Sequence, residues 1–148
     1  MATTNLGFAF RTVTLIFASA ALFTGLQAVL VPAKFASSFG ISLPSTTTTK
    51  PKSGAASATP SPEDPRACAY VSLMGARQLG TGMILSVFAY QGKWAEAATI
   101  LSIIGVVVAG TDGWYIAKTG GSVGGGLFHA GPGAAIAALA AAFLWTEA

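Results

Sequence analysis

The chain is poor in the residues from which soluble surfaces and most metal sites are built. Charged residues make up 9% of its 148 residues, against about 25% in ordinary soluble proteins. A single cysteine, Cys68, excludes a disulfide framework and a cysteine-rich metal site. One histidine and one carboxylate, His129 and Asp112, are too few for a dedicated metal site, and the eight Lys and Arg residues are too scattered for a nucleic-acid footprint. We therefore expect no metal, no cofactor and no nucleic-acid partner.

The apolar residues, at 53% of the chain, indicate an integral membrane protein. Long apolar segments lie at residues 12–31, 67–91, 95–117 and 127–145. Each has the roughly 20 residues that a helix needs to cross about 30 Å of hydrocarbon. Because Arg11 precedes the first segment, a cleaved signal peptide is the competing interpretation. The length of this segment and the lack of a clear cleavage motif favour a retained helix that ends at Pro32.

The chain changes composition abruptly after the first span. Residues 33–41 predict a short amphipathic stretch at the membrane surface. Residues 42–65 are rich in Ser, Thr and Pro, cannot bury a core, and predict a disordered linker. The sequence therefore divides into a first helix with its interfacial segment (residues 1–41), the linker, and a three-helix remainder of the same membrane domain (residues 66–148).

One long and two short connections join the four spans. The short ones are a tight turn at residues 91–94 and a loop at residues 120–126, which is too glycine-rich to be helical. This order predicts an all-α fold, an integral membrane four-helix bundle that runs up-down-up-down with a disordered first loop. Small residues four apart would let the helices approach closely in lipid. They are Ala21 and Gly25, Gly82 and Ser86, Gly105 and Ala109, and the row Ala134, Ala138 and Ala142.

Three ionisable residues lie inside or at the edges of the predicted spans: Arg77, Asp112 and His129. Charged groups are costly in a bilayer and indicate a site by default. The second span starts, the third ends and the fourth starts on the same side of the membrane. All three residues are therefore predicted in the same half of the bilayer, with Arg77 the deepest, about 15 Å into its helix.

Two interpretations of these residues stay open. In the structural one, Arg77 and Asp112 form a buried ion pair between helices, and His129 is bonded to the glycine loop. In the functional one, Arg77 binds or polarises an anionic or carbonyl oxygen, Asp112 pairs with it and orients His129, and the imidazole moves a proton. Pro132 indicates either a cavity near His129 or a harmless kink. The glycine-rich run at residues 75–82 lacks the setting of a phosphate-binding loop and predicts close helix packing.

The order of these residues resembles a domain-of-unknown-function family of small four-span membrane proteins, many of them from filamentous fungi. The resemblance covers nearly the whole chain except residues 42–65. It rests on a Pro followed by Phe-x-x-x-Phe-Gly, a Gly-x-Arg, a late Asp and an opening His: Pro32, Phe35, Phe39, Gly40, Gly75, Arg77, Asp112 and His129. It implies a multi-pass endomembrane protein with relatives in secondary-metabolite gene sets, and it supplies no catalytic residues.

These observations predict a small multi-pass membrane protein of the endoplasmic reticulum. The leading hypothesis is an enzyme or accessory factor that oxidises, isomerises or cyclises a hydrophobic metabolite in a biosynthetic pathway, which is an analogy at the level of the fold. Its site would contain Arg77, Asp112 and His129. The alternative is a non-catalytic structural, scaffolding or carrier subunit. The expected partners are the lipid bilayer and a hydrophobic small molecule.

Overall fold

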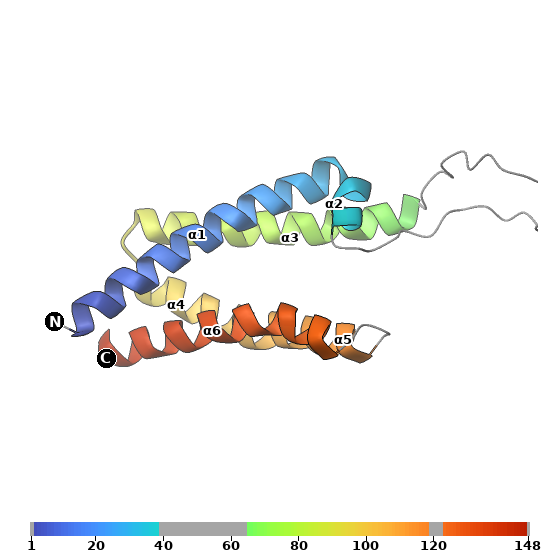
Figure 1. The fold of residues 1–148 in the computed structure, drawn as a ribbon. Coiled ribbons are helices and arrows are strands. Elements are labelled where there is room, and N and C mark those ends of the chain that lie inside the picture. The colour runs from blue at the N-terminus through green and yellow to red at the C-terminus, as the bar shows by residue number, and fades with distance from the viewer. Residues whose placement is uncertain (1, 39–64, 119–122, 148) are drawn as a thin grey trace, which may run out of the picture. The chain divides into compact units, whose positions relative to one another are not determined.

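The computed structural model of the protein describes residues 2–38, 65–118 and 123–147, and every element within these ranges is a helix. The helices are α1 (Ala2–Leu30), α2 (Pro32–Ser38), α3 (Pro65–Tyr90), α4 (Trp94–Ile103), η1 (Ile104–Val108), α5 (Ala109–Lys118) and α6 (Val123–Glu147) (Figure 1). The all-α prediction is confirmed for this part of the chain. The predicted linker at residues 42–65 lies outside it, except for Pro65, which begins α3.

The chain divides into two compact units. The first, here called the hairpin unit, consists of Met1–Ala18 and Ile84–Ala148, and the second consists of Ser19–Met83. The helices α1 and α3 each continue from one unit into the other. The joining of all helices into one up-down-up-down bundle stays a prediction.

Three helices are long and apolar enough to cross a membrane, within the ranges that the structure describes. They are Asn5–Leu30, Trp94–Lys118 and Gly126–Glu147. This result indicates a membrane protein and agrees with three of the four predicted spans. The remaining predicted span forms α3, which is 26 residues long but is not among the three. Arg77 and Gln78, in the middle of α3, lower its mean hydropathy.

The first helix begins earlier than the apolar run suggests. The apolar run predicts a helix from residue 12, yet α1 already begins at Ala2. The ring of Phe10 is fully buried and stacks on Phe143, with ring centroids 4.5 Å apart. This contact gives the start of α1 a packing partner. At its other end α1 stops at Leu30, and Pro32 opens α2 at the first helical position, where no backbone donor is needed.

The predicted tight turn between α3 and α4 is confirmed. Gly92 has a φ of 70°, a left-handed conformation that favours glycine. The amide of Lys93 donates to the carbonyl of Phe88 (2.8 Å), and the amide of Gly92 donates to that of Ala89 (3.1 Å). These two bonds form a Schellman motif, which satisfies the last carbonyls of α3 and reverses the chain.

The core of the hairpin unit joins α1, the end of α3, α4 and α6. Its buried residues are Phe10, Ala18, Leu85, Ala97, Ala98, Leu101, Ala140 and Phe143. Thr14 is buried beside them, and its hydroxyl donates to the carbonyl of Phe10 (2.9 Å), so this hydroxyl has a partner. Two phenylalanines and two leucines are the large side chains of this core, and the other four residues are alanines.

In the second unit, α1 and α3 cross at two glycines. A Cβ added to Gly25 would lie 2.8 Å from the carbonyl oxygen of Gly75, and a Cβ added to Gly75 would lie 2.6 Å from the Cβ of Ala28. Both distances are shorter than real Cβ contacts, so only glycine fits. The prediction that Gly25 and Gly75 serve close packing is confirmed. Gly80, in the same glycine-rich run, has no neighbour within 4 Å of an added Cβ.

Two predictions about the last helix are wrong. The expected glycine loop at residues 120–126 ends early, because α6 already begins at Val123. At Gly126, α6 lies so close to α5 that an added Cβ would be only 2.9 Å from the Cβ of Ala117. This contact between the helices outweighs the low helix propensity of glycine. The predicted packing row of α6 is also shifted. Its three members, Ala134, Ala138 and Ala142, are exposed. The residues that contact the preceding helix are Gly126, Ala130, Gly133 and Ala137.

The long helix that precedes α6 contains one wide turn. Between α4 and α5, η1 (Ile104–Val108) is a π-helix, and the amide of Ala109 bonds to the carbonyl of Ile104, five residues earlier. The sequence there includes three successive valines after Gly105. Branched side chains crowd a regular helix. The run of valines is therefore a feature of the sequence that could have indicated the irregular turn.

Candidate functional site

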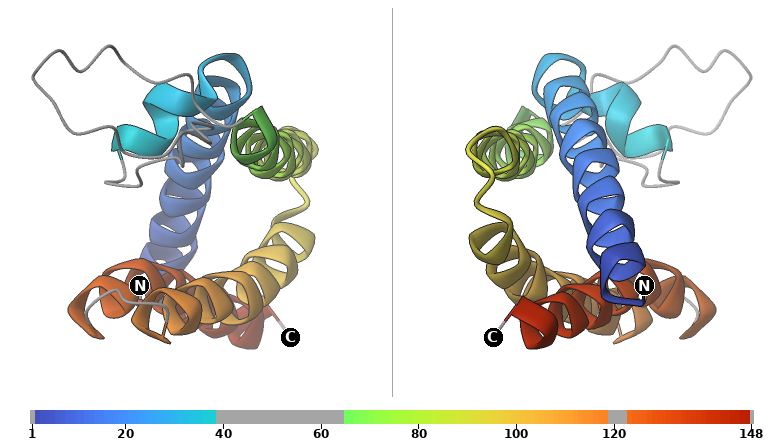
Figure 2. Two further views of the ribbon diagram at one scale, coloured as in Figure 1. Left: turned by 90° about the vertical axis from the view of Figure 1, so that its right-hand side faces the viewer. Right: turned by 90° about the vertical axis from the view of Figure 1, so that its left-hand side faces the viewer.

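The continuous helix α4–η1–α5 lies antiparallel beside α6, and glycines hold the two together (Figures 1 and 2). A Cβ added to Gly113 would lie 2.6 Å from the Cβ of Ala130 and 2.7 Å from the carbonyl oxygen of Gly126. Further along, a Cβ added to Gly105 would lie 2.8 Å from the Cβ of Ala137. These contacts fix which residues of the two helices lie at the same level.

This register places Asp112 and position 129 near one level. Asp112 precedes Gly113 and position 129 precedes Ala130. Because the helices are antiparallel, the two backbone positions lie on either side of the contact of Gly113 with Ala130, about 3 Å apart along the helix axis. Asp112 is exposed, and its carboxylate makes no hydrogen bond or ion pair with another described residue of the hairpin unit. The backbone of His129 lies in α6, while its side chain is outside the part of the chain that the structure describes.

A π-helical turn ends four residues before Asp112. The hydroxyl of Thr111 donates to the carbonyl of Val107, which is part of that turn. The side chain thus supplies a hydrogen bond where the regular helical pattern is interrupted. Single π turns inside α-helices are frequent at functional sites, so the turn independently favours a site near Asp112.

Arg77 belongs to the other unit. It is exposed on α3, where its Nη1 lies 3.9 Å from the sulfur of Met74 and its carbonyl accepts a hydrogen bond from the hydroxyl of Thr81 (3.1 Å). Gly75 faces α1 within that unit, and Arg77 is two residues further, about 200° round the helix. Arg77 therefore points away from the α1–α3 contact. Its pairing with Asp112 stays a prediction.

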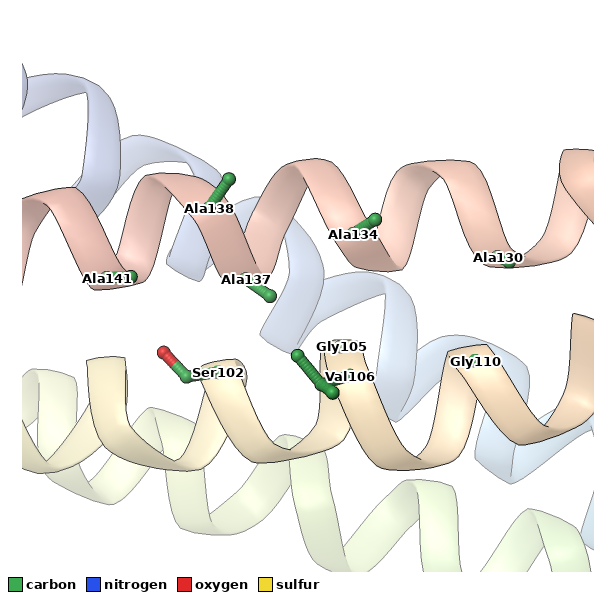
Figure 3. A pocket seen from close by; sticks show the side chains of 9 residues that line it. All are labelled: Ser102, Gly105, Val106, Gly110, Ala130, Ala134, Ala137, Ala138 and Ala141. Carbon is green, nitrogen blue, oxygen red and sulfur yellow. The ribbon is translucent and has the colours of Figure 1, made fainter.

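A groove of about 520 Å³ lies between the helix α4–η1–α5 and α6 of the hairpin unit, and the sequence did not predict it. Figure 3 shows its side chains, which are small and almost entirely apolar. The lining residues are Ser102, Gly105, Val106, Gly110, Ala130, Ala134, Ala137, Ala138 and Ala141. The hydroxyl oxygen of Ser102 is buried without a hydrogen-bond partner among the described residues. The groove comes from the absence of large side chains, which periodicity alone does not reveal.

The groove and Asp112 lie on opposite flanks of the hairpin. On α5, Gly110 is about 60° to one side of Gly113 and Asp112 about 100° to the other. On α6, Ala134 is about 40° to one side of Ala130 and position 129 about 100° to the other. Because the helices are antiparallel, the same sense of rotation leads to the same flank. Asp112 and position 129 therefore share one flank, and the groove occupies the other.

Pro132 does not interrupt α6. The helix continues through this residue to Glu147, and Pro132 is exposed. The groove just described lies close to it and is lined by Ala130 and Ala134. Among the described residues, no three His, Cys, Asp or Glu side chains gather in a group that could hold a metal ion.

Comparison with known proteins identifies a family but no activity. Neither curated proteins nor solved structures give a match to this chain. The model of one family matches residues 18–143, which include α1 from Ala18, the connection to α3, and nearly all of α6. The resemblance noted from the sequence is confirmed at this level, while the fungal and biosynthetic associations stay predictions. The chain belongs to the DUF4267 family, a domain of unknown function.

Proposed function

We propose that the protein is a small multi-pass enzyme or accessory factor of the endoplasmic reticulum membrane that acts on a hydrophobic metabolite, as in fungal secondary-metabolite pathways. One observation supports the proposal: the contact of Gly113 with Ala130, the residues that follow Asp112 and position 129 in the chain. A carboxylate beside an imidazole selects its tautomer and orients its ring, and this pairing is common where histidine moves protons.

Proton transfer is the chemistry that these residues can supply. In an isomerisation or a cyclisation, His129 would take a proton from one carbon of the substrate and return it at another. Asp112 would stabilise the imidazolium formed between the two steps. Oxidation of the same substrate would require an oxidant as a second substrate. Arg77 would bind an anionic or carbonyl oxygen and withdraw charge from the reacting carbon.

The role of Arg77 requires that α3 also crosses the membrane. With 26 residues, α3 is about 39 Å long, which exceeds the hydrocarbon thickness of about 30 Å. A fourth span would complete the up-down-up-down bundle and place Arg77 in the same half of the bilayer as Asp112. The close α1–α3 contact at Gly25 and Gly75 supports this arrangement, because small residues let helices associate in lipid.

The alternative function is a non-catalytic structural, scaffolding or carrier subunit. The glycine contacts in both units favour it, because they give each helix pair a tight interface that needs no ion pair. In that case Arg77 and Asp112 serve helix packing alone and take no part in chemistry.

Metabolite profiling of a deletion strain tests the proposal. The strain would be complemented with the wild-type gene, His129→Ala, Asp112→Asn or Glu96→Gln, with membrane expression checked for each. Glu96 is an exposed carboxylate at the other end of the same long helix and serves as the matched control. We expect a product that is lost in the deletion, His129→Ala and Asp112→Asn strains but present with Glu96→Gln. Full complementation by all three variants would support the non-catalytic alternative.

A further inference from the structure

We infer that the hairpin unit binds the phospholipid headgroup region at two belts of aromatic and cationic side chains, which hold it at a fixed depth in the bilayer. The first belt consists of Arg11, Trp94 and Trp145, and the second of Trp114, Tyr115 and Lys118. Aromatic residues with an apolar ring and a polar edge prefer the interface between lipid tails and headgroups. The inference does not depend on the proposed chemistry.

The first belt joins three helices at one level. The guanidinium of Arg11 on α1 lies 5.2 Å from the centre of the Trp94 ring, at the start of α4. The stack of Phe10 on Phe143 brings the next residue of α1 close to the level of Trp145 on α6. Trp145 is 87% exposed, so its ring is left largely uncovered by the described residues.

The second belt lies near the end of α5. The Nζ of Lys118 lies 4.6 Å from the centre of the Trp114 ring, and Tyr115 meets that ring edge-on at 5.3 Å. Trp114 and Tyr115 are both more than half exposed. A cation over an aromatic ring keeps its charge toward the phosphates while the ring stays among the upper acyl carbons.

The separation of the belts matches a bilayer. Trp94 and Trp114 are 20 positions apart on one continuous helix, which corresponds to about 30 Å, the thickness of the hydrocarbon core. Between them, the charged residues of this helix are Glu96 and Asp112, each two positions from a belt tryptophan. The exposed side chains midway are apolar, as Ile103 and Val106 illustrate. The candidate span of this helix, Trp94–Lys118, begins and ends at residues of the two belts.

The composition of the chain allows a direct test, because it contains three tryptophans and each belongs to a belt. Variants that retain one tryptophan, with phenylalanine at the other two positions, would be reconstituted in phosphatidylcholine vesicles. The vesicles would carry bromine either near the top of the acyl chain or near its end. Fluorescence quenching by the two lipids reports the depth of each ring. A control probe, Ile103→Trp in a background with all three tryptophans replaced, marks the bilayer centre.

We expect each native tryptophan to be quenched more by the shallow bromine than by the deep one, and the probe at position 103 to show the reverse. Circular dichroism would verify that each variant retains its helices. A native tryptophan quenched mainly by the deep bromine would overturn the inference, as would a probe at position 103 that is no deeper than the belts. Absence of quenching at the tryptophans by either lipid would overturn it as well.

Discussion

Replacing Gly113 by alanine should push α5 away from α6, whereas the same replacement at Gly110, one turn earlier, should not. The new Cβ at position 113 would lie 2.6 Å from the Cβ of Ala130, and at position 110 it would meet nothing within 4 Å. Carbon atoms in contact are ordinarily about 3.5–4.0 Å apart, so the helices must separate by about 1 Å at Gly113.

The two variants share one favourable effect and differ in one unfavourable effect. Alanine is better than glycine in a helix by about 1 kcal/mol, and this gain applies at both positions. Overpacking of a close contact costs about 1–3 kcal/mol, and this cost applies only at Gly113. The free energies of unfolding of Gly113→Ala and Gly110→Ala should therefore differ by about 1–3 kcal/mol, with Gly110→Ala the more stable.

Unfolding by SDS in mixed micelles, followed by far-ultraviolet circular dichroism, would measure this difference. Equal stability of the two variants would refute the reasoning. It would mean that α5 and α6 are not in close contact at Gly113, and the common level of Asp112 and position 129 would lose its support.

Three further outcomes are expected. Gly75→Ala should lower the SDS midpoint of unfolding, whereas Gly80→Ala should leave it unchanged or raise it, because an added Cβ meets backbone atoms only at Gly75. Arg77→Leu and Asp112→Leu should each lower the folded yield in detergent, because removing one partner of a buried pair costs about 3–5 kcal/mol of stability. The double variant should lose less than the sum of the two, and strictly additive losses would show that the residues do not interact. A Gly/Ser linker of equal length in place of residues 42–64 should leave membrane insertion unchanged, since loop length has little effect on closure entropy, and loss of insertion would reveal a structured element there.

Much of the fold follows from the sequence because lipid restricts what a chain can do. A run of uncharged apolar residues must be helical in a bilayer, since every backbone group needs an internal partner. The turn at Gly92 is also readable, because its residue type matches the φ that the turn requires. The nearness of positions 112 and 129 follows from the short connection between α5 and α6.

Other features could not be predicted, because they depend on contacts between helices. The glycines at the start of α6 are poor helix formers by themselves, and Gly126 becomes helical against Ala117. The row of small residues that packs in α6 is shifted by one position from the row that looked most regular, since alanine is so frequent there that several rows fit equally well. The groove beside Ser102 is likewise a property of two helices together.

The π-helical turn at Ile104–Val108 sets how far α5 is rotated about the helix axis relative to α4. One residue more or less in a helix turns everything beyond it by about 100° and moves it by about 1.5 Å along the axis. Loss of a single valine from this turn would therefore carry Asp112 and Gly113 round the helix together, and Gly113 would no longer face Ala130. The contacts of α4 with α1 through Trp94 would be unaffected. The number of residues in this π-helical turn thus determines the side of α5 on which Asp112 lies, while the contacts of α4 stay the same.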